Sequence, residues 1–206
     1  DSLPDHRQPL QFCPASSAFL LLDVLSDHPL RGDREFQQQF HQMAQSLEVL
    51  RKRAARFSIP AIYVCQSGLR SLPQSLELPL IAASPPGPIL APLHSDYVLR
   101  SCQSSVCMLG NLDLLLTPLR VTTLIVGGLA ASICPLLAAN DVLLASYRLI
   151  VPSDCVASPS ESDRRNALEH LRHFTDAETP LSDSLVFVES LTPLTPGPNG
   201  AGSAMR

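Results

Sequence analysis

The chain has 206 residues, of which 45% are hydrophobic and 17% charged, and its formal net charge is −4. This length fits one domain that buries a core without disulfides or metals. The composition excludes a disordered chain, and the charge gives no attraction to nucleic acid or an anionic membrane. No apolar run reaches the roughly 20 residues that span a bilayer. We therefore expect neither nucleic acid nor membrane as a partner.

Residues 1–15 are polar at first and contain prolines, do not resemble a signal peptide, and are interpreted as an N-terminal extension of a cytoplasmic protein. None of the six cysteines forms a CxxC pair, and Cys65 and Cys155 border apolar runs. Reduced thiols are therefore favoured over disulfides.

The first half of the chain predicts two strands, one helix and one long excursion. Residues 18–23 and 61–65 are apolar on both faces, as strands of a covered parallel sheet are. Between them, residues 33–57 carry apolar side chains at steps of three and four, with Asp33 as N-cap. Residues 68–95 are rich in proline and form either a lid over a site or an interface arm.

In the second half, the pattern predicts strands at residues 96–100, 121–126, 148–151 and 185–188. It predicts helices within residues 104–119, at 135–147, and at 160–174 with Ser160 as the start of a capping box. Residues 191–206 have the composition of a disordered tail. The alternation predicts an α/β fold of three αβα layers around a mainly parallel, doubly wound sheet, spanning residues 16–190.

In such sheets, ligands bind beyond the carboxyl ends of the strands. Asp23, Arg100 and Cys134 each stand at such an end. Pro135 is expected to open a helix, which makes Cys134 its N-cap and lowers the pKa of the thiol through the helix dipole. Taken singly, each residue has a simpler interpretation. A cysteine such as Cys134 is more often buried and inert. An aspartate such as Asp23 more often forms a turn at a strand end, and an arginine such as Arg100 more often belongs to a surface ion pair.

Three stretches together resemble the isochorismatase-like cysteine hydrolases, which include nicotinamidases and carbamoylsarcosine-type amidases. They are AFLLLDVLSD with Asp23 at the family's catalytic acid, DYVLRSCQSSV with Arg100 at its catalytic lysine, and TTLIVGGLAASICP with Cys134 at its nucleophile. PSDCVAS, at residues 152–158, matches a further strand-end pattern of the family. The resemblance covers nearly the whole domain.

The resemblance implies that Cys134 attacks an amide-like carbonyl, that Asp23 accepts the proton, and that a thioester is then hydrolysed. It implies a cis peptide bond between Leu129 and Ala130, and an oxyanion hole made by the backbone N–H groups of Ala130 and Cys134. It also suggests substrate contacts at Gln66, Ser105 and Ala131, and a homo-oligomer, either a dimer or a tetramer.

Two residues depart from the family pattern. Arg100 keeps the positive charge of the family's lysine but cannot act as an acid near neutral pH. Pro135 follows the nucleophile where a β-branched residue is usual, and it removes one N–H group. The stretch after residue 65, CQSGLRSLPQ, lacks histidine, so we expect neither zinc nor another cofactor.

The sequence is compatible with three functions. The first is a cysteine hydrolase of a small C–N substrate. The second is a weak or inactive family member that binds a small molecule or a protein, which Arg100 and Pro135 favour. The third is a structural α/β subunit of an oligomer.

Overall fold

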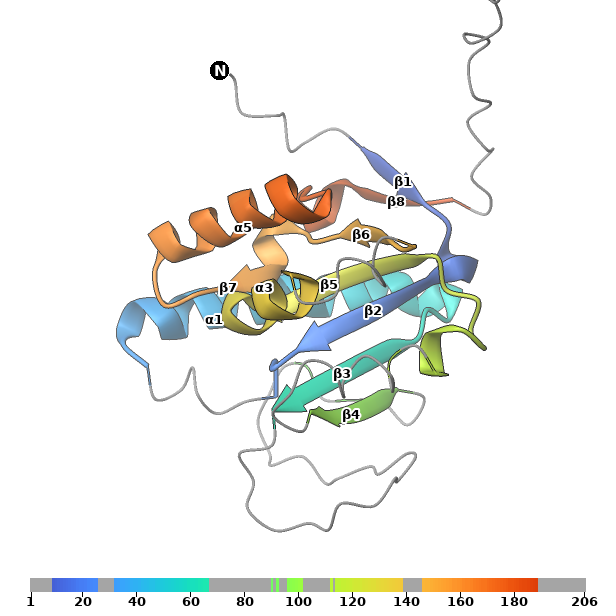
Figure 1. Ribbon diagram of the computed structural model, residues 1–206, viewed down its shortest axis with the longest axis horizontal. Coiled ribbons are helices and arrows are strands. Elements are labelled where there is room, and N and C mark those ends of the chain that lie inside the picture. The colour runs from blue at the N-terminus through green and yellow to red at the C-terminus, as the bar shows by residue number, and fades with distance from the viewer. Residues whose placement is uncertain are drawn as a thin grey trace, which may run out of the picture.

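The computed structural model of the protein describes residues 9–25, 32–66, 90, 92, 96–101, 112, 114–138 and 146–188, without the side chains of residues 65, 66, 100, 101 and 138. Within these ranges the predicted α/β fold is confirmed, because a parallel sheet lies between helices on both faces (Figure 1).

The central sheet has all its described strand pairs parallel. Its strands lie in the order β4 (Tyr97–Ser101), β3 (Ala61–Gln66), β2 (Ser17–Leu22), β5 (Thr123–Leu129), β6 (Arg148–Ile150), and β7 (Val156–Ala157) pairs with the end of β5. Every residue of β2 and β5 is buried, which explains why both read as uninterrupted apolar runs. The chain builds outward from β2 to β4 and then crosses to β5 on the other side of β2. The topological switch point therefore lies between β2 and β5.

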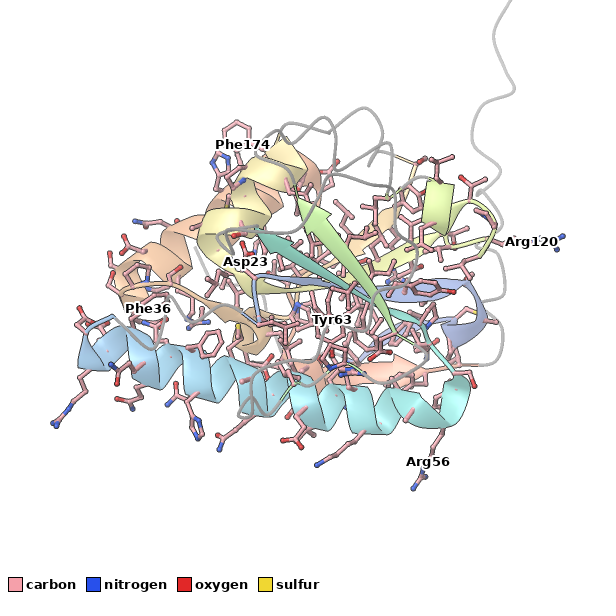
Figure 2. All side chains as sticks on the ribbon, turned by 90° about the horizontal axis from the view of Figure 1, so that it is seen from below. Asp23, Phe36, Arg56, Tyr63, Arg120 and Phe174 are labelled. Carbon is pink, nitrogen blue, oxygen red and sulfur yellow. The ribbon has the colours of Figure 1, made fainter. Side chains whose placement is uncertain are left out.

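Helix α1 (Arg34–Ala54) covers one face of the sheet, and α3 (Ala130–Ala138) and α5 (Glu161–Thr175) cover the other (Figure 2). The alternation of β2 explains both layers, because Phe19 and Leu21 pack toward α1 whereas Leu20 and Leu22 pack toward α3 and α5. Each face is thus buried in its own apolar core.

The two long helices begin where the sequence predicts. Asp33 accepts a hydrogen bond from the backbone N–H of Phe36 at 2.9 Å, and α1 starts at the next residue. Ser160 accepts one from the N–H of Asp163 at 3.1 Å, so the predicted capping residue of α5 is confirmed.

The two ends of the described chain form a separate two-stranded sheet, in which β1 (Leu10–Phe12) pairs in parallel with β8 (Leu185–Phe187). The side chain of Phe12 is 0% exposed. Residues 10–12 of the expected N-terminal extension therefore form a strand, and the last strand does not join the central sheet. Strands of three residues are too short to produce a readable alternation, which is why the sequence pattern missed β1.

The helix expected at residues 135–147 begins five residues earlier, at Ala130, directly after β5. Pro135 consequently lies inside α3 and has no N–H to donate to the carbonyl of Ala131. Residues 139–145 lie outside the described residues, as does most of the excursion at 68–95, of which Leu90 is buried in the core on the α1 side.

Gly128 controls how closely β5 approaches β2. Its φ is +131°, and a Cβ atom placed on it would lie 2.0 Å from the carbonyl oxygen of Leu22, its register partner. A residue with a side chain fits neither this dihedral angle nor this space. Gly128 therefore allows the chain to turn from β5 into α3 while staying against the end of β2.

We expect Gly128→Ala to lower the free energy of unfolding by roughly 3 kcal/mol, because both the backbone angle and the contact with the Leu22 carbonyl become unfavourable. Gly127→Ala is the matched control. A Cβ atom there would meet the end of the flexible Leu47 side chain at 2.7 Å and the Cys155 carbonyl at 3.1 Å, without a positive φ. We expect a loss of about 1–2 kcal/mol for that variant. Urea denaturation followed by far-UV circular dichroism measures both, and equal losses would contradict the role of Gly128.

An ion pair joins α1 to the start of β4. Arg51 donates to Asp96 Oδ2 at 2.6 Å and to the hydroxyl of Tyr63, and its guanidinium carbon lies 5.4 Å from the centroid of the Tyr63 ring. The side chains of Arg51 and Asp96 are 14% and 5% exposed, so both charges are largely removed from water. Asp96 directly precedes β4, and the ion pair therefore helps to fix the position of the strand that carries Arg100.

Asp96→Asn leaves the Arg51 charge largely buried without its counter-charge, and we expect the free energy of unfolding to fall by about 3 kcal/mol. Glu48→Gln is the control, because it breaks the Lys52–Glu48 pair, in which Lys52 is 73% exposed. That change should cost less than about 0.5 kcal/mol. Chemical denaturation of both variants tests the difference, and a loss at Asp96 as small as that at Glu48 would show that the Arg51 contacts are dispensable.

Candidate active site

The carboxyl ends of β2 and β5 lie side by side, because their register pairs Leu22 with Gly128. Asp23 follows β2 directly, and the first turn of α3 follows β5 directly. This is the switch point of the sheet, where open α/β folds bind their ligands. Two of the three segments that the sequence singled out therefore meet at one place.

Asp23 is held in an unusual conformation. Its φ is 54°, in the left-handed region that aspartate tolerates better than most residues, and its backbone N–H donates to the carbonyl of Val64 at 2.8 Å. The residue is only 7% exposed. A buried carboxylate requires hydrogen-bond donors around it, because burial otherwise disfavours its charge.

One such donor comes from α3. The hydroxyl of Ser132, the third residue of the helix, donates to Asp23 Oδ2. The sequence motifs do not single out this residue, although Ser132 is the one hydroxyl between Thr123 and Asn140. A single hydroxyl in an otherwise apolar helix start, beyond a buried strand, is the signal that points to it.

Cys134 is half-buried and packs against the core on the α3 side of the sheet. The expectation that it caps a helix is wrong, since it is the fifth residue of α3. The helix dipole acts most strongly on a thiol at the first turn of a helix. Cys134 lies beyond that turn, so the dipole lowers its pKa less than expected. Burial raises the pKa of the Cys134 thiol, which is the opposite of the expected shift.

Ser132 and Cys134 are separated by about 3 Å along the axis of α3 and by about 200° around it. The hydrogen bond between Ser132 and Asp23 therefore does not by itself turn the thiol toward the carboxylate. It does hold the helix start that carries Cys134 against the end of β2.

The expected oxyanion hole is also altered. The peptide bond between Leu129 and Ala130 is trans, like every described peptide bond, so the expected cis bond is wrong. The turn out of β5 is made instead by the positive φ of Gly128. In a helix that begins at Ala130, the N–H groups without helical acceptors belong to its first residues, Ala130 among them, whereas the N–H of Cys134 enters the regular helical pattern.

The remaining predicted site residues are placed only in part. The backbone of Arg100 lies in β4 opposite Cys65, and β4 is separated from β2 by β3. The backbone of Gln66 ends β3, but the side chains of Arg100 and Gln66 are not among those described. Ala131 is exposed in the first turn of α3, and Ser105 lies outside the described residues.

Within the described ranges, no group of three or more His, Cys, Asp and Glu side chains is arranged to hold a metal ion. No helix in the described part of the chain is long and apolar enough to cross a membrane. Cys134 and Cys155 are free thiols.

The model of the isochorismatase domain family matches residues 17–179. This chain belongs to the isochorismatase family. Over 97 residues it is 34% identical to the uncharacterized isochorismatase family protein YaaI of Bacillus subtilis, a match that covers 47% of this chain and 54% of that protein. The chain thus spans about half the length of this curated relative.

Solved structures show the same family fold. The N-carbamoylsarcosine amidase of Thermoplasma acidophilum superposes with a TM-score of 0.61 at 22% identity, covering 82% of this chain and 97% of that one. A cysteine hydrolase of Pseudomonas syringae superposes with a TM-score of 0.60 at 17% identity, covering 88% and 95%. At these identities the likeness establishes the fold.

The raised pKa of Cys134 predicts how its alkylation by iodoacetamide depends on pH. Only the thiolate reacts with iodoacetamide. The alkylation rate of Cys134 in the folded protein should therefore rise at a higher pH than the alkylation rate of Cys134 in the urea-unfolded chain. Peptide mapping by mass spectrometry separates Cys134 from the other cysteines, and Cys134→Ala identifies its peptide. Cys155, whose pKa is raised well above the usual value by burial and by Asp154, should stay unlabelled in the folded chain. A midpoint for Cys134 below that of the unfolded chain would instead reveal a cationic group beside the thiol.

Proposed function

We propose that this protein is a cysteine hydrolase that cleaves the C–N bond of a small amide-like substrate. The observation that carries the proposal is the contact between buried Asp23 and the first turn of α3, the helix that bears Cys134, at the switch point of an isochorismatase-family sheet. The names of two relatives of the fold, an amidase and a cysteine hydrolase, agree with this reaction class.

In the proposed reaction, the sulfur of Cys134 attacks the substrate carbonyl, and the thiol proton passes to the carboxylate of Asp23. Collapse of the tetrahedral intermediate breaks the C–N bond, and Asp23 returns the proton to the departing nitrogen. Water then hydrolyses the thioester and restores the thiol. Since burial keeps the resting thiol protonated, a base that takes its proton during attack is required.

The negative charge that develops on the carbonyl oxygen needs donors. The backbone N–H groups at the start of α3, which include that of Ala130, suit this role because they have no acceptor within the helix. Ala131 is exposed in the same turn and is proposed to border the substrate, together with Gln66 and Ser105.

Arg100 is proposed to act by charge alone. An arginine stays protonated at all relevant pH values, so it stabilises a thiolate or an oxyanion without relaying a proton. The proposal includes a small-molecule substrate, no cofactor, a cytoplasmic location, and a dimer or tetramer of this chain.

Two observations favour a second candidate function, which is binding of a small molecule or a protein without turnover. The pKa of the Cys134 thiol is raised, and Pro135 interrupts the hydrogen bonding of α3 directly after it. A neutral thiol suits a ligand-binding cleft as well as a reactive one.

A panel of small primary amides and carbamoyl compounds separates the two functions. For a hydrolase, we expect ammonia or amine release, and Cys134→Ala and Asp23→Asn should each lower kcat/KM by at least about 1,000-fold. Rapid acid quenching followed by intact mass analysis should show an acyl adduct on Cys134. Leu114→Ala, a change of a 73% exposed side chain away from Asp23, serves as control. Saturable binding of a panel compound without product release, unchanged in Cys134→Ala, would support the binding function instead.

A further inference from the structure

The hydroxyl of Ser132 is the described side-chain donor that reaches the Asp23 carboxylate from α3. Asp23 is 7% exposed and Ser132 is half-buried, so the hydrogen bond is shielded from competing water. Such a shielded bond to a charged acceptor is stronger than a neutral one.

The backbone around this pair is fixed from both sides. Gly128 lies against the carbonyl of Leu22, one residue before Asp23, and the chain reaches Ser132 four residues later. On the other side, the N–H of Asp23 is bonded to the carbonyl of Val64 in β3. The backbone at Asp23 and the segment that leads to Ser132 are therefore both held by the pairing of β2 with its neighbours, whereas the orientation of the Asp23 carboxylate depends on side-chain contacts.

Ser132 does not itself face the thiol, because residues two apart on a helix point in different directions. Its effect on Cys134 must pass through Asp23. The role that follows is to hold the carboxylate in one orientation, and the hydroxyl keeps its own proton throughout.

We propose that Ser132 is a positioning residue that orients the Asp23 carboxylate for proton transfer from Cys134. The proposal rests on the proposed function, in which Asp23 takes the thiol proton. When the sulfur attacks, the thiol proton moves to the Asp23 carboxylate. The hydrogen bond from Ser132 holds the carboxylate in one orientation before the transfer, and it holds the protonated carboxyl group in the same orientation afterwards.

The test is the pH profile of iodoacetamide alkylation at Cys134 in the full chain, which requires no knowledge of the substrate. Asp23→Asn removes a negative charge from the thiol's surroundings, and we expect faster alkylation near neutral pH. Asn tolerates the left-handed backbone of residue 23, so this variant should keep the fold. Ser132→Ala removes the hydroxyl that donates to the carboxylate, and we expect alkylation at neutral pH to slow about fivefold, the ratio that one hydrogen bond supplies.

Three comparisons make this outcome specific. Ser132→Thr, which keeps the hydroxyl, should retain the profile of the unchanged protein. In the Asp23→Asn background, Ser132→Ala should produce no further shift, because the two residues act as one unit. Ser182→Ala removes a similar bond, from Ser182 Oγ to Asp154 Oδ2 at 2.6 Å, and should leave the profile of Cys134 unchanged.

The result that overturns the proposal is distinct from the one that overturns the function. If Asp23→Asn leaves the Cys134 profile unchanged, the carboxylate does not act on the thiol and the hydrolase proposal fails. If Asp23→Asn shifts the profile but Ser132→Ala has no effect, or shifts it equally in both backgrounds, only the role of Ser132 is refuted. An equal shift from Ser182→Ala would refute it as well.

Discussion

The close contact between β5 and β2 at Gly128 and Leu22 is the constraint on which the site depends. Glycine is needed there twice, for the positive φ and for the space beside the Leu22 carbonyl. This contact brings the end of β5 against the end of β2. The first turn of α3, which follows β5, therefore lies beside Asp23 in space. Gly128 thus permits the close approach that brings the first turn of α3 into contact with the buried acid.

This early helix start changes the chemistry expected at Cys134. A thiol at a helix N-cap gains from the dipole, whereas a thiol in the second turn is governed by its burial. The structure places Cys134 in the latter position and raises its pKa. Reactivity then depends on groups that surround the thiol, and Asp23 is a described acid that contacts this helix start through Ser132.

The Arg51–Asp96 ion pair lies away from this site and stabilises the sheet on which the site is built. The Arg51–Asp96 ion pair fixes the strand that carries Arg100 to α1, on the face of the sheet away from α3. Breaking a largely buried ion pair costs several kcal/mol. Such a pair is therefore suited to holding β4 in place against α1. The described part of the protein therefore keeps the Arg51–Asp96 ion pair in the scaffold, and the Cys134 thiol and the Ser132 hydroxyl at the switch point.

By itself, the sequence determined the fold class, the apolar strands, the caps Asp33 and Ser160, and the approach of Asp23 to the segment that bears Cys134. The strands and caps follow from local rules, because periodicity and capping chemistry act over a few residues. The fold class and the approach of Asp23 follow from the order of strands and helices, because the carboxyl ends of parallel strands meet at one edge of the sheet. Only the tertiary structure decided the start of α3, the pairing of β1 with β8, and the bond from Ser132 to Asp23. Each of these depends on contacts between residues more than a hundred positions apart, and no local pattern carries that information.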